Sequence, residues 1–331
     1  MILKHIKICA IVMILAVVAT SSSVYPGKKK LAQSGFQFLS VGSDARASAM
    51  GDAYTTVGAN ALFYNPSGLS YLSTKFDVTV NYNTWIADIT HSSVAMAFNP
   101  KHGLFGVFGL SLNWVDYGDF EGTMVWSNPK GYVKTEVFNP TAISIGVGYA
   151  KSLTDRFSVG GQIRYVSQSL GRSIDQNSSG LSAKKNIASV TAVDFGTIYD
   201  TGVKSIKLGM SVRNFSQEFK FEEEGFQLPL TFRIGVSVNA FEFYNFASIN
   251  HQLLVSIDRV HPRSFPEFFN IGFDYLFMDI FSLRVGYVSN QDEYDFSYGF
   301  GIKKFGVAFD YAYTPFGVFD KVQRITAHLS L

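Results

Sequence analysis

The chain has 331 residues, with 28 Lys+Arg against 26 Asp+Glu, and one cysteine. This balance excludes the strongly basic surface that nucleic-acid binding requires, so no nucleic-acid partner is expected. Charged residues make up only 16%, whereas aromatic residues reach 15%, and Phe alone contributes 31 residues. This profile excludes a disordered or coiled-coil chain. What remains is one large β-rich domain or two smaller domains with ample apolar surface to bury.

The first 23 residues have the pattern of a secretory signal peptide. Lys4 and Lys7 precede an uninterrupted apolar run from Ile8 to Ala19, and Thr20 and three serines follow it. The run is shorter than the roughly 20 residues of a membrane-spanning helix. Cleavage is expected near residues 21–23, and it would remove the only cysteine, which lies at the start of the run and is badly placed for lipidation. The mature chain is therefore expected to have no disulfide.

The remaining sequence alternates with a period of two, which is typical of β-strands. In the last segment, Arg324, Thr326, His328 and Ser330 share one face, and Gln323, Ile325, Ala327, Leu329 and Leu331 share the other. About fourteen such segments follow one another from residue 76 to the end, each close to the 9–11 residues that cross a membrane as a strand. Residues 76–331 are thus predicted to form a single transmembrane antiparallel β-barrel of about 14 strands.

The connections between these segments alternate between short and long. Bacterial outer-membrane barrels have short periplasmic turns and longer outer loops. With both ends of the barrel at the periplasm, the long outer loops are predicted at Asp116–Pro140, Leu170–Ala188 and Asn214–Leu228. This pattern places the protein in the outer membrane of a Gram-negative bacterium, in contact with outer-membrane lipids.

A soluble secreted β-sandwich would also show alternation, but its polar face would carry the Lys, Glu and Thr of a water-facing sheet. Here the non-apolar face is rich in Gly, Ala and Ser with isolated charges, as expected for a crowded barrel lumen. Aromatic side chains near the strand ends fit the girdles at membrane interfaces. They include Tyr82, Trp85, Trp114, Tyr149, Tyr275, Tyr287 and Tyr313.

Residues 24–75, between the signal peptide and the first strand, are not strand-like. Asp44 is placed to cap a short Ala-rich helix through Met50, Gly51 to end it, and Asn65-Pro66-Ser67-Gly68 has turn chemistry. A small-residue segment of this length before a closed barrel is expected inside the lumen, as a hatch.

Residues 36–72 resemble the N-terminal signature of PorV/PorQ-type outer-membrane proteins, whose fold is related to that of the long-chain fatty-acid transporter (FadL-like) barrels. The residues that carry the resemblance are Ala45, Arg46, Ala47, Met50, Gly51, Ala53, Asn65, Pro66, Gly68 and Leu69. The resemblance implies a fourteen-stranded barrel with an N-terminal hatch. Asp52 departs from the family pattern, which commonly has a second Gly, and a carboxylate buried there needs a donor such as Arg46 or backbone amides. The terminal Leu331 also departs from the aromatic residue common at this position.

The resemblance implies two functions. PorV-like members act in type IX secretion, where the outer loops accept exported proteins and pass them to surface attachment. Aromatic side chains in two of the long loops are candidate partner contacts, or they pack on each other over the barrel mouth. They are Phe215, Phe219, Phe221 and Phe226 in one loop and Trp126 in the other. In FadL-like members a hydrophobic ligand crosses the plugged lumen, and Phe36, Phe38 and Phe63 either line its pocket or simply seal the hatch.

Charged side chains at inward positions of the strands are the remaining candidates. They are Arg164, Arg213, Arg233, Arg284, Asp194, Asp258, Asp274 and Asp310. Opposite charges in one interior can pair, so a salt-bridge network that fills the lumen and locks the hatch is favoured over a conductive or ligand-binding role.

Enzymatic and metal-dependent functions have little support. The histidines are scattered one to a segment, with no HExxH spacing and no cysteine partner for zinc. The Gly-x-Ser-x-Gly and P-loop patterns are absent from the sequence. The chain is therefore expected to be a non-enzymatic secretion component, with no cofactor and no bound metal, and hydrophobic-ligand transport is the alternative.

Overall fold

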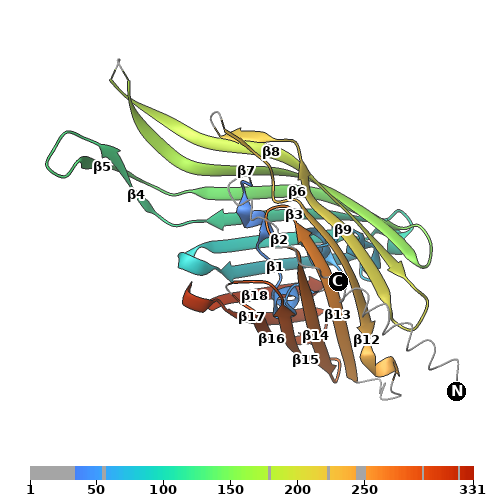
Figure 1. Cartoon of the computed structure of the whole chain (residues 1–331). Coiled ribbons are helices and arrows are strands. Elements are labelled where there is room, and N and C mark those ends of the chain that lie inside the picture. The colour runs from blue at the N-terminus through green and yellow to red at the C-terminus, as the bar shows by residue number, and fades with distance from the viewer. Residues whose placement is uncertain are drawn as a thin grey trace.

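A computed structural model describes residues 34–53, 57–177, 180–221, 224–243, 251–292, 294–319 and 321–331, without the side chains of residues 175–183. The predicted signal peptide and its cleavage site lie outside these residues. Antiparallel strands close into a barrel in which the first strand pairs with the last, as Val80 pairs with Ala327. The prediction of a 14-stranded antiparallel barrel with an N-terminal hatch is confirmed (Figure 1).

The barrel strands, between which two separate hairpins are inserted, follow one another around the wall in the order of the chain. They are β1 (Phe76–Thr84), β2 (Thr90–Phe98), β3 (Val107–Asp116), β6 (Thr141–Ser152), β7 (Phe157–Asn177), β8 (Gly180–Asp200), β9 (Lys207–Ser216), β12 (Thr231–Asn239), β13 (His251–Pro262), β14 (Phe268–Phe277), β15 (Phe281–Val288), β16 (Phe296–Lys304), β17 (Val307–Pro315) and β18 (Lys321–Ser330).

Short helical turns occupy several connections between strands. They are η5 (Ile86–Asp88), η6 (Pro100–Gly103), η7 (Ala240–Phe243) and η8 (Gly317–Phe319). The barrel begins and ends at one rim, where the amide of Phe76 donates to the carbonyl of Leu331 (2.9 Å). This rim also carries turns such as Phe305–Gly306 and is therefore the periplasmic end, because outer-membrane barrels keep their short turns there.

The opposite, outer end carries three projections. Strands β4 (Phe120–Val125) and β5 (Tyr132–Phe138) form one separate hairpin, and β10 (Phe219–Phe221) and β11 (Glu224–Phe226) form another. The third projection is the far half of β7 and β8, which pair with each other up to Asn177 and Gly180 (Figure 1). The expectation of a loop at Leu170–Ala188 was wrong, because these residues continue the two strands beyond the barrel.

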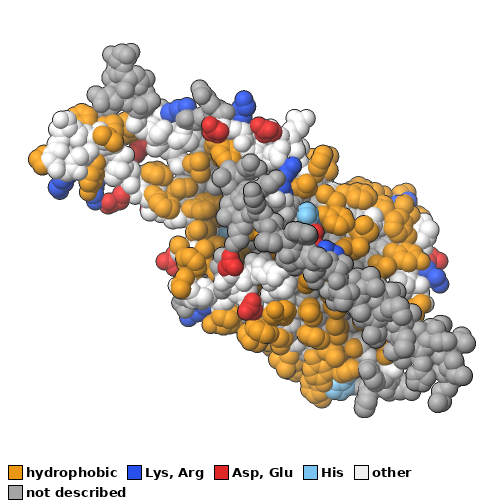
Figure 2. Space-filling view, in the orientation of Figure 1, with side chains coloured by type: hydrophobic (Ala, Val, Ile, Leu, Met, Phe, Trp, Pro, Cys, Tyr) orange, Lys and Arg blue, Asp and Glu red, His pale blue; other side chains and the backbone are white. Residues whose placement is uncertain are grey.

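Alternation along each strand separates an apolar outer face from a polar lumen. On β3, for example, Leu110 and Leu112 are exposed, whereas Ser111 and Asn113 point inward and are buried. Figure 2 shows the resulting hydrophobic side chains gathered over the outside of the strands. No helix within the described ranges is long and apolar enough to cross a membrane.

In the described part of the hatch there are four short helices. They are η2 (Gln37–Ser40), α2 (Ala45–Ala49), η3 (Ala59–Phe63) and η4 (Pro66–Tyr71). The predicted cap at Asp44 is confirmed, because its carboxylate accepts from the amide of Arg46 (3.1 Å). At Asn65, where a turn was predicted, the side chain accepts from the amide of Ser67 (3.1 Å) and caps η4. Each cap satisfies a backbone donor that a helix start leaves unpaired.

The described chain enters the lumen from the outer end and leaves it at the periplasmic end. At the outer mouth the amide of Gly35 donates to the carbonyl of Gln227, just beyond β11 (3.0 Å). At the other end the amide of Asn99, in a periplasmic turn, donates to the carbonyl of Lys75 (2.9 Å). The hatch therefore runs the length of the lumen.

Candidate functional site

Three barrel strands form a seat for helix α2 from residues with little or no side chain. Gly272 on β14 lies opposite Gly286 on β15, which in turn lies opposite Ser297 on β16. The Ser297 hydroxyl accepts from the amide of Gly51 (3.1 Å) and donates to the carbonyl of Ala49 (3.2 Å). A Cβ added at Gly286 would overlap the amide nitrogen of Gly51. The small residues of the lumen face thus let hatch backbone lie directly on wall backbone.

Gly51, which follows α2, needs to be glycine for two reasons. Its φ of +63° is in the left-handed region, and a Cβ there would come within 3.2 Å of the backbone of Tyr287. Asp52 is also left-handed, with a φ of 58°, so the chain reverses directly after the helix. The second glycine of the family pattern is thus replaced by a residue whose type tolerates this conformation.

The centre of the hatch is an apolar core against β2, β3 and β6. Met50, Leu62, Leu69 and Tyr64 are buried in one cluster with small alanines from the wall, and Phe63 belongs to the same cluster. Phe63 is thus packed in the hatch core and lines neither of the two large cavities of the lumen, and its role as a ligand contact or a seal stays a prediction.

A second cluster lies at the outer mouth, where hatch and loop aromatics meet. Phe36 and Phe219 have ring centroids 4.5 Å apart, and both side chains are buried. Phe221 and Phe226 pack against the same cluster. Of the two alternatives for these loop aromatics, the structure favours packing over the mouth.

Two of the candidate partner contacts remain on the surface. Phe215 is 62% exposed beyond a bulge of β9, and Trp126 is 42% exposed next to β4, where Val125 is 86% exposed. Their role as contacts for a partner stays a prediction. The hairpin β4–β5 offers the larger set of exposed apolar side chains.

All eight predicted inward charges belong to the lumen, and six of them are largely buried. Arg164 binds Asp194 through two hydrogen bonds, from Nε (2.7 Å) and from Nη2 (2.8 Å), and both side chains are almost fully buried. The carboxylate of Asp194 also accepts from the amide of Asn214 (2.7 Å). This backbone donor lies at the bulge between β8 and β9, so the pair fixes the point where β9 leaves the regular wall.

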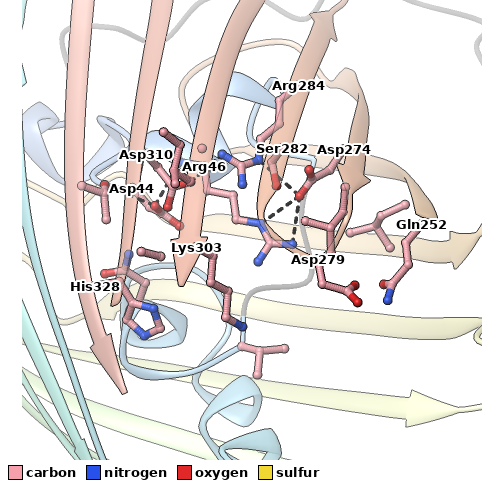
Figure 3. Close-up of a pocket in the computed structure, with 18 of the residues that line it drawn as sticks. Asp44, Arg46, Gln252, Asp274, Asp279, Ser282, Arg284, Lys303, Asp310 and His328 are labelled. Carbon is pink, nitrogen blue, oxygen red and sulfur yellow. Dashed lines mark hydrogen bonds and ion pairs between the residues drawn. The ribbon is translucent and has the colours of Figure 1, made fainter. Parts of the chain in front are cut away.

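A second network ties the hatch to the wall on the periplasmic side. Arg46 of α2 donates to Asp274 on β14 (3.0 Å), and Arg284 on β15 approaches the same carboxylate (3.2 Å). Arg284 also donates to Asp310 on β17 (2.6 Å). Figure 3 shows the two guanidinium groups converging on Asp274. Arg46 therefore joins the hatch to two wall charges through one shared carboxylate.

The structure gives Asp52 a donor other than the expected Arg46 or backbone amides. Arg46 points to Asp274 instead, and the Asp52 carboxylate accepts from the Ser48 hydroxyl (3.2 Å). Arg233 on β12 donates to the backbone carbonyl of Asp52 and to the carboxylate of Asp258 (3.0 Å). The family departure at Asp52 is thus accommodated by a hydroxyl one helical turn earlier.

The hatch separates two large cavities in the lumen. The periplasmic cavity, of about 610 Å³, is lined by charged and polar groups that include Asp44, Lys303 and His328 (Figure 3). The outer cavity, of about 590 Å³, is lined by the loop of hatch from Gln37 to Gly42 and by wall residues of β9, β12 and β18. Since the hatch forms a wall of each, neither cavity is an open pore through the barrel.

Three charged residues of the lumen were missed by the sequence reasoning. Arg324 is 5% exposed and donates to the carbonyl of Gly42 (3.2 Å), and Asp77 accepts from His328 (2.6 Å). The alternation of β1 and β18 places both on the lumen face, so this signal was present. Asp44 was predicted only as a cap. Burial raises the pKa of its carboxyl, and the charge of Asp310 adds to this rise.

One expected girdle residue has a different place. Trp85 was grouped with the interfacial aromatics, but its ring packs edge-on against Phe316 (4.9 Å) and under the guanidinium of Arg324 (5.4 Å). It lines the outer cavity and is a lumen residue. Period-two alternation does not reach Trp85, because the strand β1 has already ended at Thr84.

Ser330, His328 and Asp77 lie together at the periplasmic end, but not as a catalytic relay. His328 Nε2 approaches both Asp77 (2.6 Å) and Ser330 Oγ (3.2 Å), and the Ser330 hydroxyl donates to Asp77 (2.7 Å). A relay needs the acid and the nucleophile on opposite ring nitrogens. Within the described residues, no group of three His, Cys, Asp or Glu side chains is arranged to hold a metal ion.

Comparison with solved structures defines the class of fold. The monoaromatic hydrocarbon channel CymD matches with a TM-score of 0.57 and 12% identity, over 88% of this chain and 98% of that one. The Pseudomonas putida toluene transporter TodX has a TM-score of 0.56 and 13% identity, over 87% and 97%. A Pseudomonas aeruginosa FadL homologue has 0.50 and 11%, over 86% and 97%. At these identities the likeness shows the fold alone, which is that of an outer-membrane β-barrel.

The family of the chain is shown by a match at the level of sequence. The family model described as "Type IX secretion system protein PorV" matches residues 27–258, and the chain belongs to this family. A sequence comparison with curated proteins finds no match. The protein is thus an outer-membrane component of the type IX secretion class in a Gram-negative bacterium, and the predictions of family, fold and localisation are confirmed.

Proposed function

We propose that this barrel binds exported proteins on its outer side and hands them to surface attachment, without passing them through its lumen and without enzymatic activity. The observation that carries this proposal is the position of the contacts. The hatch runs through the lumen from mouth to periplasmic rim and separates its two cavities, whereas the hairpin β4–β5 projects beyond the outer end with exposed apolar side chains. Exposed aromatic and aliphatic groups on a projection are typical partner anchors.

The base of the hairpin allows it to be removed cleanly. The amide of Tyr117 donates to the carbonyl of Pro140 (3.2 Å), and the Asn139 side chain donates to Asp116 (3.0 Å). These bonds close the connection between β3 and β6 below the hairpin. The hairpin strands pair only with each other, so their loss leaves the barrel ladder intact.

Replacing residues 120–138 by a short Gly/Ser turn is expected to abolish surface display of exported proteins while the barrel still folds. The measurement is the surface proteome of whole cells, with heat-modifiable gel migration as the folding check. The double variant Val125→Ser/Trp126→Ser is expected to weaken display by about tenfold, the effect of losing an anchor pair. Removing the exposed Lys134–Glu121 ion pair with glutamines is the matched control. Undiminished display after hairpin removal would sink the proposal.

Transport of a hydrophobic small molecule is the second candidate, because aromatic side chains form part of the wall of the outer cavity. Phe38, Phe265 and Phe268 line it, and the hatch segment from Gln37 to Gly42 forms part of its boundary. The solved hydrocarbon channels share the fold.

On the transport hypothesis, Phe38→Ala is expected to change uptake of an apolar tracer such as radiolabelled toluene by several-fold, because the substitution widens the apolar cavity. Phe63→Ala, in the sealed core away from both cavities, is the comparison variant. Equal uptake in both variants and in a deletion strain would exclude transport.

A further inference from the structure

The periplasmic rim of the barrel carries three lysines on one continuous part of the wall. Lys304 ends β16, Lys75 directly precedes β1, and Lys101 lies in the turn between β2 and β3. The strands β16, β17, β18, β1 and β2 are consecutive neighbours in the wall. Two residues before Lys101, the amide of Asn99 donates to the carbonyl of Lys75 (2.9 Å). We call this stretch, made of residues 304–306, 75–76 and 100–106, the basic arc.

Each of the three ammonium groups lies over the ring of a nearby phenylalanine. The pairs, with the distance from Nζ to the ring centre, are Lys304–Phe305 (5.0 Å), Lys75–Phe76 (5.5 Å) and Lys101–Phe105 (5.4 Å). All three rings are exposed, Phe305 at 91%. A cation–π contact holds an amine near the ring without using up its three N–H donors. Since no described carboxylate pairs with these amines, their donors are available to an acceptor from outside the chain.

The basic arc lies at the edge of the lipid-facing surface. On β16, Lys304 follows Phe300 and Ile302 on the outward face, and both apolar side chains are exposed. Outside β1 and β2, the rings of Phe76 and Phe98 stack at 4.9 Å. A lysine that follows an apolar band keeps its stem along the hydrocarbon and its ammonium among the polar head groups. The three amines are therefore at the level of the head groups of the periplasmic leaflet.

Charge distinguishes the basic arc from the rest of the described rim. No residue of the arc is acidic, whereas elsewhere on the rim acidic and basic residues lie close together in the sequence. These other residues are Lys151, Asp155, Arg156, Asp200, Lys204 and Glu242. Asp279, in the turn next to the arc, and Lys303 both line the periplasmic cavity, so they face the lumen (Figure 3). Even if a terminal carboxylate at Leu331 is counted, three lysines minus this one charge leave the arc with +2.

We infer that the basic arc binds anionic phospholipids of the periplasmic leaflet, such as phosphatidylglycerol. Their phosphodiester oxygens accept from the lysine amines, and their acyl chains pack on the exposed phenylalanine rings. The arc covers four strand spacings, roughly 19 Å, which is room for a few adjacent lipids. An acidic soluble protein has the same charge complementarity, but the arc is continuous with a surface that lipid covers. The inference is independent of the docking role proposed for the hairpin β4–β5, which lies at the other end of the barrel.

Electron paramagnetic resonance of spin-labelled lipids measures this preference directly. The purified barrel is placed in phosphatidylcholine vesicles with a trace of spin-labelled phosphatidylglycerol or, in a parallel sample, of spin-labelled phosphatidylcholine. The motionally restricted part of the spectrum reports the lipid in contact with the barrel. We expect phosphatidylglycerol to associate with the parent at least about threefold more strongly than phosphatidylcholine. Salt at about 1 M, where the screening length is roughly 3 Å, should remove most of the difference.

A triple variant of the basic arc tests the assignment. In Lys75→Gln/Lys101→Gln/Lys304→Gln, the two lipids should associate almost equally, because the charges that select the phosphodiester are gone. All three side chains are exposed, so the barrel should fold as before, which heat-modifiable migration checks. The variant Lys75→Arg/Lys101→Arg/Lys304→Arg keeps the charges and should keep the preference.

The matched control removes the same number of positive charges from the rest of the rim. Lys151→Gln/Arg156→Gln/Lys204→Gln should keep the preference of the parent for phosphatidylglycerol. Equal losses in the two glutamine variants would overturn the inference, because a general charge effect would then explain the preference. Equal association of both lipids with the parent would also overturn it, and would leave the arc to an acidic soluble partner. Neither result bears on surface display, so the docking proposal is judged separately.

Discussion

In the Gly286→Ala variant, which adds one methyl group, most molecules are expected not to fold into a closed barrel. The added Cβ would overlap the amide nitrogen of Gly51, and backbone atoms on both sides leave no rotamer that relieves the overlap. The neighbouring Gly272 already holds the carbonyl of Met50 close to the wall. We expect destabilisation of at least about 3 kcal/mol, the upper end for overpacking. Folded protein in the outer-membrane fraction should fall at least tenfold.

Gly161→Ala is the matched control. Gly161 lies on β7, on the same lipid-facing side as Ile163, and a Cβ there meets only one atom, the carbonyl oxygen of Asp194 at 3.5 Å. This variant should fold like the parent by heat-modifiable migration. A normal yield of folded Gly286→Ala, with the hatch still protected from protease, would show that α2 is not seated directly on the wall.

The barrel strands could be predicted from the sequence because the direction in which each residue faces depends only on its neighbours along the chain. A strand in a membrane alternates between lipid and lumen, so each residue's face follows from its neighbours in sequence. Leu110 and Ser111 illustrate this alternation on β3. The helix cap at Asp44 could be predicted for the same reason, since its carboxylate accepts from an amide only two residues away.

Partner choice inside the lumen was not predictable in the same way. Arg46 and Asp274 are separated by 228 positions, and their pairing depends on how the hatch is seated against β14 and β15. From the sequence, a donor such as Arg46 or backbone amides was expected for Asp52, whereas its carboxylate accepts from the Ser48 hydroxyl. Alternation shows that a charge faces the lumen, but the neighbours it meets there are set by barrel closure and by the path of the hatch.

The outer loops show a second limit of prediction from the sequence. Their aromatic content was visible, yet the same residues serve two purposes: Phe219 packs on Phe36 inside the mouth, whereas Phe215 of the same loop remains exposed. The far parts of β7 and β8 were mistaken for a loop because their polar side chains resemble loop composition. These two segments pair with each other, from Arg172 with Lys185 to Asn177 with Gly180. They lie beyond the barrel, so the alternation between lipid and lumen does not identify them as strands.

The hatch and the cavities together explain how one fold serves different roles. The small-residue seat and the Arg46–Asp274 pair hold the hatch in the lumen, so the barrel offers an outer surface and two pockets that the hatch separates. The hydrocarbon channels share the strands, but the outer projections of this chain carry its proposed partner contacts. Function in this family is thus expected to depend on what lies above and inside the barrel more than on the barrel wall.

Arg164→Met should be the most destabilising single change among the lumen charges, at about 3–5 kcal/mol. It removes both hydrogen bonds to Asp194 and leaves that carboxylate buried, with one backbone amide from Asn214 as its remaining donor. Urea unfolding of the barrel in lipid vesicles measures the loss. The bulge between β8 and β9 should also loosen, which amide hydrogen exchange at Phe215 and Ser216 would detect.

The comparison that decides the cause is a second arginine–carboxylate pair with a similar geometry but in contact with solvent. Arg259 donates to Glu267 at the outer rim (2.7 Å), where the two side chains are 31% and 38% exposed. Arg259→Met should therefore cost less than about 1 kcal/mol. The double variant Arg164→Met/Asp194→Leu should recover most of the loss, because no unpaired charge remains. Equal costs for Arg164→Met and Arg259→Met would mean that the lumen is hydrated enough to solvate Asp194, and the hatch would then not close a dry interior.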